Sequence, residues 1–251
     1  MPMAATYSDV RADGPLLRIK LTEPAPGRAN FLTSAACRQL ISIYAGVADK
    51  PEIRAVVLSA TGPHFCGGGD RAEINQLVAI DPTREALREI TETGRRLCEA
   101  ILGSDVLTIA SVHGNVVGAG LAVMLCCDLR VAAEGTSLRL PELSMGVAPA
   151  WGGTLGRLIG EVGVARAREM VLAGEWVDAA TAQRHSLLHR VAPASEVDAV
   201  VAGWVSRALA TPVSAFRAAK TLFRAHERAS RMADLSLLDS QLMVASSVLG
   251  S

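Results

Sequence analysis

Residues 114–128 read GNVVGAGLAVMLCCD, with three glycines in seven positions and then no charge until Asp128. Glycines allow a tight turn and let the backbone approach another group closely. The apolar run around 116–127 is shorter than the roughly 20 residues that span a bilayer, so we expect a buried helix rather than a membrane span. A helix N-terminus offers unpaired N–H groups and a partial positive charge. The segment therefore predicts a turn that directs backbone donors at a negatively charged group.

Composition narrows the classes of function. The 251 residues carry 25 basic and 25 acidic side chains, so the formal net charge is zero and favours neither nucleic acid nor an anionic membrane as partner. The start of the chain, MPMAATYSDVRADG, lacks the apolar core of a signal peptide. The five cysteines are odd in number and lack zinc or C-x-x-C spacing, which indicates buried reduced thiols and a cytoplasmic location.

Hydrophobic patterns outside this segment alternate between strand and helix. We expect strands at 16–21, 53–59 and 106–112, and helices from Thr33 or Ser34 to about Asp49 and from Asp81-Pro82 to about Leu102. Two short strands follow Asp128, and from about Thr154 the pattern is helical apart from 187–193. This order predicts an α/β core with a helical C-terminal third.

A second glycine loop, TGPHFCGGGD at 61–70, shares the design of the first: a buried strand precedes it and a helix follows. Asp70 and Glu73 have the spacing of a helix N-terminal capping pair. Two such loops together would form a two-donor pocket for an oxyanion. Glu142, in the PEL segment at 141–143, is the candidate for proton transfer beside it, because the proline before it restricts the backbone.

The chain resembles the crotonase superfamily of enoyl-CoA hydratases and isomerases. The resemblance rests on RANFL (28–32), HFCGGGD (64–70), TIASVHGNVVGAG (108–120), CDLRVAAEGTSLRLPELSMGVAPAWGGTLGRLIG (127–160) and EMVLAGEWVDAATAQRHSLLHRV (169–191). It implies an α/β fold with a ββα spiral core over 1–193. It also implies a helical C-terminal region over 194–251 that forms homotrimers or hexamers.

The resemblance further implies a thioester of coenzyme A or of an acyl-carrier protein as substrate, with no separate cofactor and no metal. By position, the backbone N–H groups of Gly69 and Ala119 would hold the thioester oxygen, within loops that also contain Gly67 and Gly118. Arg28, Arg71 and, more weakly, Lys220 are candidates for contacting the coenzyme, with solvated surface charges as the alternative.

The sequence departs from the family at two acidic positions. Hydratases of the family carry a second glutamate, which falls on Ala122 here, and some isomerases carry an acid that falls on Ala150. One carboxylate, Glu142, suits moving a double bond better than adding water. We therefore favour isomerisation; the alternatives are decarboxylation or dehydration of an acyl-CoA or carrier-protein thioester, and a subunit that binds thioester without turning it over.

Four further side chains have open roles. Trp151 would shorten or cover the acyl pocket, or pack against the C-terminal helices. His64 and Asp70 adjoin the first loop as possible accessory groups, with helix capping the better explanation for Asp70. His185 and His189 stand four apart, but the second lies in a strand-like segment, so we expect no metal site there.

Overall fold

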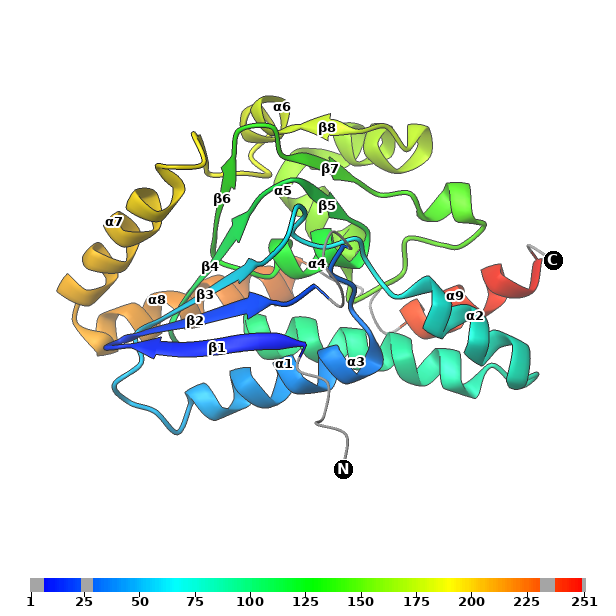
Figure 1. The fold of residues 1–251 in the computed structure, drawn as a ribbon, viewed down its shortest axis with the longest axis horizontal. Helices are drawn as coiled ribbons and strands as arrows, with labels where there is room; N and C mark the ends of the chain where they lie inside the picture. The colour runs from blue at the N-terminus through cyan, green and yellow to red at the C-terminus, as the bar shows by residue number, and fades with distance from the viewer. Residues whose placement is uncertain (1–6, 24–28, 231–237, 250–251) are drawn as a thin grey trace.

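The computed structural model describes residues 7–23, 29–230 and 238–249. Its main sheet has six strands in the order β1-β2-β3-β4-β6-β9 (Figure 1). Only the edge pair is antiparallel in this sheet; the other neighbours are parallel. The strands are β1 (Ser8–Asp13), β2 (Leu16–Leu21), β3 (Ala55–Ala60), β4 (Leu107–Val112), β6 (Leu129–Ala133) and β9 (Arg190–Ala192).

Both faces of this sheet are buried, as expected for parallel strands. Alternate residues of β3 belong to two separate cores: Val56 and Leu58 to one, Ala55 and Val57 to the other. The larger core lies against α1 (Ser34–Val47), α3 (Glu85–Leu102) and α4 (Ala119–Leu125). The smaller core lies against α7 (Val197–Ala210), whose buried residues repeat at helical spacing.

A second, small sheet pairs strands that are far apart in the sequence. It contains β5 (Asn115–Val117), β7 (Ser137–Arg139) and β8 (Val177–Asp178), with β5 parallel to β7 and β7 antiparallel to β8. A parallel bridge joins Cys66 to Val116, so the first glycine loop lies alongside β5.

The remaining elements surround these sheets. They are α2 (Arg71–Ile80), the 3₁₀ helix η1 (Glu142–Met145), α5 (Thr154–Arg168), the π-helix η2 (Glu169–Ala173), α6 (Ala179–Arg184), α8 (Val213–Ser230) and α9 (Asp239–Leu249). The last of these, red in Figure 1, packs against α3. In the described ranges no single helix meets the length and hydropathy of a membrane span; α7 with residues 213–227 does so only as a pair bent by 111°.

Most of the predicted elements are confirmed, but the start of one helix differs and the short strands β1, β5 and β8 were not expected. The helix expected from Asp81-Pro82 begins three residues later, at Glu85, because Asp81 Oδ1 and Oδ2 accept the N–H groups of Thr83 and Ala86 and form a turn ahead of the helix. The edge strand β1 has no counterpart in the sequence-based expectation, because its residues after Ser8 are exposed and lack a buried periodicity.

A buried ion pair fixes α8 to the core. Lys220 Nζ donates to Asp128 Oδ2 at 2.7 Å and to the Val106 carbonyl at 2.8 Å, and its side chain is 8% exposed. Thr108 donates to the same carboxylate oxygen through its N–H and its hydroxyl. Lys220 is thus held inside the protein, and its suggested contact with coenzyme phosphates is wrong.

We expect Lys220→Ala to lower the free energy of unfolding by about 2 kcal/mol or more, because it leaves a partly buried carboxylate without its cation. Urea unfolding at fixed protein concentration measures the change. The exposed Lys50 provides the control, since Lys50→Ala should change the free energy by less than about 0.5 kcal/mol. Equal effects of the two substitutions would contradict a structural role for the pair.

Candidate active site

The first glycine loop lies between two other segments of backbone. Gly67 donates to the Asn30 carbonyl at 2.8 Å, and the Gly68 carbonyl accepts from Leu32 at 2.8 Å. On the other side, Cys66 exchanges hydrogen bonds with β5, donating to Asn115 and accepting from Val117. This pairing leaves the Gly69 N–H with no acceptor among the described residues.

The start of α4 supplies a second free donor next to it. Ala119 is the first residue of α4, and its N–H likewise has no acceptor in the described part of the chain. A Cβ at Gly68 would lie 3.6 Å from this nitrogen and 3.1 Å from the Val117 carbonyl oxygen, so the two loops are in direct contact. Gly68 has φ +99°, which only glycine adopts readily.

Glu142 is buried at the same place. It begins η1 directly after Pro141, and its carboxylate packs behind the second loop: a Cβ at Gly118, which has φ +51°, would lie 2.8 Å from Glu142 Oε1. Glu142 is 9% exposed, and its Oε2 has no hydrogen-bond partner among the described residues. Burial therefore raises the pKa of the Glu142 carboxyl from 4.5 to about 7.

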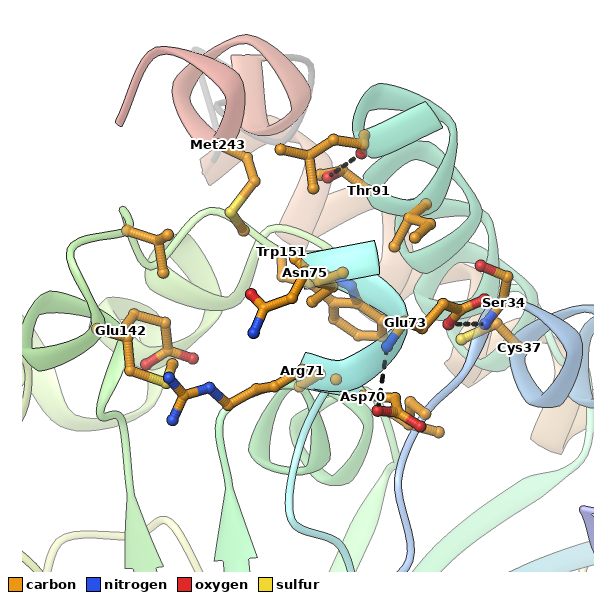
Figure 2. A pocket seen from close by; sticks show the side chains of 18 residues that line it. Ser34, Cys37, Asp70, Arg71, Glu73, Asn75, Thr91, Glu142, Trp151 and Met243 are labelled. Atoms are coloured by element: carbon orange, nitrogen blue, oxygen red, sulfur yellow. Dashed lines mark hydrogen bonds between the residues drawn. The ribbon is translucent and has the colours of Figure 1, made fainter. Parts of the chain in front are cut away.

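These groups meet in one pocket of about 150 Å³, shown in Figure 2. It contains six of the predicted site residues: Gly69, Asp70, Arg71, Ala119, Glu142 and Trp151. Arg71 and Asn75 of α2 extend toward the side that holds Glu142. The apolar part of the lining includes Leu87 and Ile90 of α3, Trp151, and Met243 of α9, with Thr91 of α3 beside them.

The other carboxylates of the pocket already have backbone partners. Asp70 caps α2, accepting from Ala72 at 2.8 Å and from Glu73 at 3.4 Å, which confirms its capping role. Glu73 Oε2 accepts the Ser34 N–H at 2.9 Å, so it binds the start of α1 instead of completing the capping pair. Among the described residues, Glu142 is therefore the pocket carboxylate that has a buried oxygen without a hydrogen-bond partner.

Three more of the predicted residues, Gly67, Gly118 and His64, lie outside the pocket lining. Gly67 packs against the Phe31 ring, and Gly118 lies directly against the Glu142 carboxylate. His64 Nδ1 accepts the Asn115 N–H at 3.2 Å, which occupies one side of its ring with a structural contact, and its accessory role stays a prediction. Arg28 lies outside the described residues.

Neither the thiols nor the histidine pair offers a second reactive centre. All five cysteines are buried and none is in a disulfide within the described residues, and burial raises the pKa of Cys37, which lines the pocket, to about 12. A thiol that stays protonated is a poor nucleophile. His189 Nδ1 accepts from the Arg130 N–H, and the described residues contain no cluster of three or more potential metal ligands.

Sequence reasoning missed the apolar side of the pocket. Leu87, Ile90, Thr91 and Gly94 follow the spacing i, i+3, i+4, i+7, which marks one face of α3 and was a usable signal. Met243 carried no local signal, because it reaches the pocket only through the packing of α9. That helix is fixed to the loop 146–153 by the hydrogen bonds Gly153 N–Asp239 Oδ2 (2.8 Å) and Ala148 N–Ser246 Oγ (3.1 Å).

Comparison with known proteins is consistent with this geometry. The family model described as "Enoyl-CoA hydratase/isomerase" matches residues 11–247. A probable enoyl-CoA hydratase, echA8, of Mycobacterium tuberculosis is 29% identical over 88% of this chain and 81% of its own length. The 2,3-dehydroadipyl-CoA hydratase of Escherichia coli is 32% identical over 69% of this chain and 65% of its own length.

Solved structures share the fold over nearly the whole chain. An enoyl-CoA hydratase from Mycobacterium avium subsp. paratuberculosis superimposes with a TM-score of 0.84 at 25% identity, covering 99% of this chain and 95% of that one. An enoyl-CoA hydratase from Bacillus halodurans superimposes with a TM-score of 0.88 at 20% identity, covering 96% of this chain and 95% of that one. At this identity the likeness is one of fold alone.

The raised pKa of Glu142 predicts a pH-dependent stability. The native state favours the protonated carboxyl, so its contribution is complete below pH 4.5 and is lost as the pH rises to about 7. Relative to Glu142→Gln, the wild-type free energy of unfolding should fall by up to about 3 kcal/mol across that interval and then level off.

Urea unfolding of both proteins between pH 4.5 and pH 8 measures this difference. The exposed Glu52 is the matched control, because Glu52→Gln should follow the wild-type curve throughout. Parallel curves for wild type and Glu142→Gln would show that the carboxyl titrates normally.

Proposed function

Because the chain belongs to the enoyl-CoA hydratase/isomerase family, we propose that it acts on an acyl-CoA thioester through an enolate and moves a carbon–carbon double bond. One observation carries the proposal: a buried carboxylate oxygen and two backbone donors, all without a partner among the described residues, belong to the same pocket. Coenzyme A enters as part of the substrate, and an acyl-carrier thioester would present the same carbonyl.

In this mechanism the Gly69 and Ala119 N–H groups donate to the thioester oxygen. The Glu142 carboxylate removes a proton from the α-carbon next to the thioester carbonyl, and the electron pair of the broken C–H bond becomes part of the enolate. The two donors hold the negative oxygen, an interaction whose loss typically costs about 3–4 kcal/mol of transition-state stabilisation. Glu142 then returns the proton to another carbon of the enolate, which leaves the double bond shifted. A pKa of about 7 suits a group that first accepts and then donates a proton.

In the described part of the pocket, the lack of a second buried, unpartnered acid supports isomerisation over hydration. Ala122 and Ala150 are buried, at 0% and 4% exposure, at the positions where the family resemblance implies acids in other members. Asp70 and Glu73 each hold the start of a helix by accepting backbone N–H groups, which gives both carboxylates a structural role. Glu142 would thus have to perform both proton transfers of a hydration alone.

Decarboxylation is the second candidate, and Arg71 favours it. Its guanidinium is exposed and lines the pocket, and it forms no ion pair within the described residues. A cation in that position would hold a substrate carboxylate near the oxyanion donors, where loss of CO₂ generates the same enolate without a base. Release of CO₂ from a carboxyacyl thioester would support this candidate.

Self-association as a trimer or hexamer is part of the proposal. Leu222 and Phe223 of α8 are 72% and 68% exposed, and adjacent large apolar side chains on a surface mark interaction sites. Sedimentation of the purified protein should give a mass three or six times that of the chain. A monomer at micromolar concentration would contradict this assembly.

A cytoplasmic location remains an expectation.

The proposed chemistry predicts that the protein exchanges the α-hydrogens of a saturated acyl-CoA in D₂O. Glu142→Gln should slow this exchange by roughly 100-fold or more, because the base is lost while the fold and the donors remain. The wild-type rate should rise with pH through about 7 as the carboxyl ionises. Mass spectrometry of the recovered acyl-CoA measures the exchange.

The matched control is Glu52→Gln, which should exchange at the wild-type rate. An unchanged rate in Glu142→Gln would overturn the assignment of the base. Binding of acyl-CoA without any exchange would instead favour decarboxylation or a subunit that binds thioester without turnover.

A further inference from the structure

The indole ring of Trp151 lines the pocket and packs against the backbone of α3 at Gly94. A Cβ built on Gly94 of α3 would lie 2.2 Å from Cε2 and 2.5 Å from Cζ2 and Nε1 of Trp151. Real Cβ atoms do not approach other atoms so closely, so the ring occupies the space that the missing side chain leaves. Gly152, the next residue of the loop, lies against Cys98, which is one turn further along α3 than Gly94. A Cβ on Gly152 would lie 2.4 Å from Cys98 Sγ. The loop that carries Trp151 therefore packs so tightly against α3 that neither glycine has room for a side chain.

Four uncharged residues, Leu87, Ile90, Thr91 and Met243, line the pocket together with the ring. Leu87, Ile90 and Met243 complete this side of the pocket, and Thr91 donates its hydroxyl to the Leu87 carbonyl at 2.9 Å (Figure 2). The Thr91 hydroxyl is thus satisfied within its own helix. A charged acyl terminus would lose its hydration here without a partner, which is costly.

The size of the pocket limits what fits against the ring. A closed apolar cavity of about 150 Å³ accommodates a molecule the size of benzene, which is about six carbon atoms. The pocket of this protein has a similar volume and is open on one side; that volume includes the space beside the donors and Glu142, so the room left next to Trp151 is small.

We propose that Trp151, seated on Gly94, sets the length of the acyl site and selects thioesters of short, uncharged acyl groups of up to about six carbons. The inference rests on the proposed function, because it assumes that this pocket receives the acyl part of a thioester. Trp151 would contact the substrate, whereas Gly94 is a positioning residue that acts through the ring.

The test is the binding of saturated acyl-CoAs of four to twelve carbons, measured by titration calorimetry and therefore independent of turnover. Wild type should bind the hexanoyl ester at least about 10-fold more tightly than the decanoyl ester, because the additional methylenes of the longer chain have no room next to Trp151. Trp151→Gly should abolish this preference, and Trp151→Phe, which keeps an aromatic ring for packing, should reduce it. Trp176→Gly is the matched control, because this second indole is 48% exposed and stacks near Arg139, outside the pocket.

Gly94 gives a second variant that leaves the ring in place. Gly94→Ala should push the indole toward the cavity and strengthen the preference for short chains. Gly46→Ala is its control, because a Cβ at Gly46 of α1 meets nothing within 4 Å. A preference that is the same in wild type, Trp151→Gly and Gly94→Ala would overturn the proposal.

The outcomes separate this inference from the proposed function. Loss of proton exchange in Glu142→Gln at every chain length, with no chain-length preference in wild type, would support the enolate chemistry and contradict the role of Trp151. A preference that depends on Trp151 in a protein that exchanges no protons would support the acyl site and contradict the chemistry. Failure to bind any acyl-CoA would contradict both.

Discussion

A carboxylate removed from water is the constraint on which the site depends. Glu142 can lie against Gly118 only because that residue has no side chain, and Gly118 can adopt its positive φ for the same reason. Its buried oxygen has no hydrogen-bond partner in the described residues, so its ionised form is destabilised and the pKa rises. A carboxylate that is costly to ionise in the folded protein is also one that transfers protons near neutral pH.

The fold keeps this arrangement in place by pairing backbone with backbone. The first glycine loop is bonded on one side to residues 30–32 and on the other to β5, and β5 pairs in turn with β7, which leads to Glu142. Three distant segments of sequence therefore meet through hydrogen bonds that involve no catalytic side chain. Within the described residues, this pairing occupies the N–H groups of Gly67, Asp70 and Gly118 and leaves those of Gly69 and Ala119 without an acceptor.

Local chemistry made much of this predictable from sequence. The alternating pattern of Leu16–Leu21 predicts β2, Asp70 predicts the start of α2, and Pro141 with Glu142 predicts a fixed acid after a strand. Family resemblance then identified the two glycine loops as parts of one site, a relation that spacing alone does not provide.

What remained hidden depends on contacts between distant segments. The pairing of Lys220 with Asp128 joins positions 92 residues apart, and Lys220 looks from its sequence like any surface cation on a helix. The closeness of Trp151 to Gly94 is equally invisible, because the absence of a side chain on one helix matters only once the loop is docked on it. Glu73 illustrates a further limit: its spacing fits a capping pair, but its carboxylate accepts the Ser34 N–H at the N-terminus of a different helix, α1.

The attachment of α9 to the loop 146–153 connects the position of this helix to the pocket. Its two hydrogen bonds reach the loop that also carries Trp151, and Met243 projects from its middle into the pocket. Occupancy of the pocket and docking of this helix are therefore thermodynamically linked, and linkage is reciprocal: whatever free energy a bound acyl chain adds to docking, docking adds to the affinity for that chain. A change at the far end of the polypeptide can thus tune affinity for substrate while leaving every proton-transferring atom where it was.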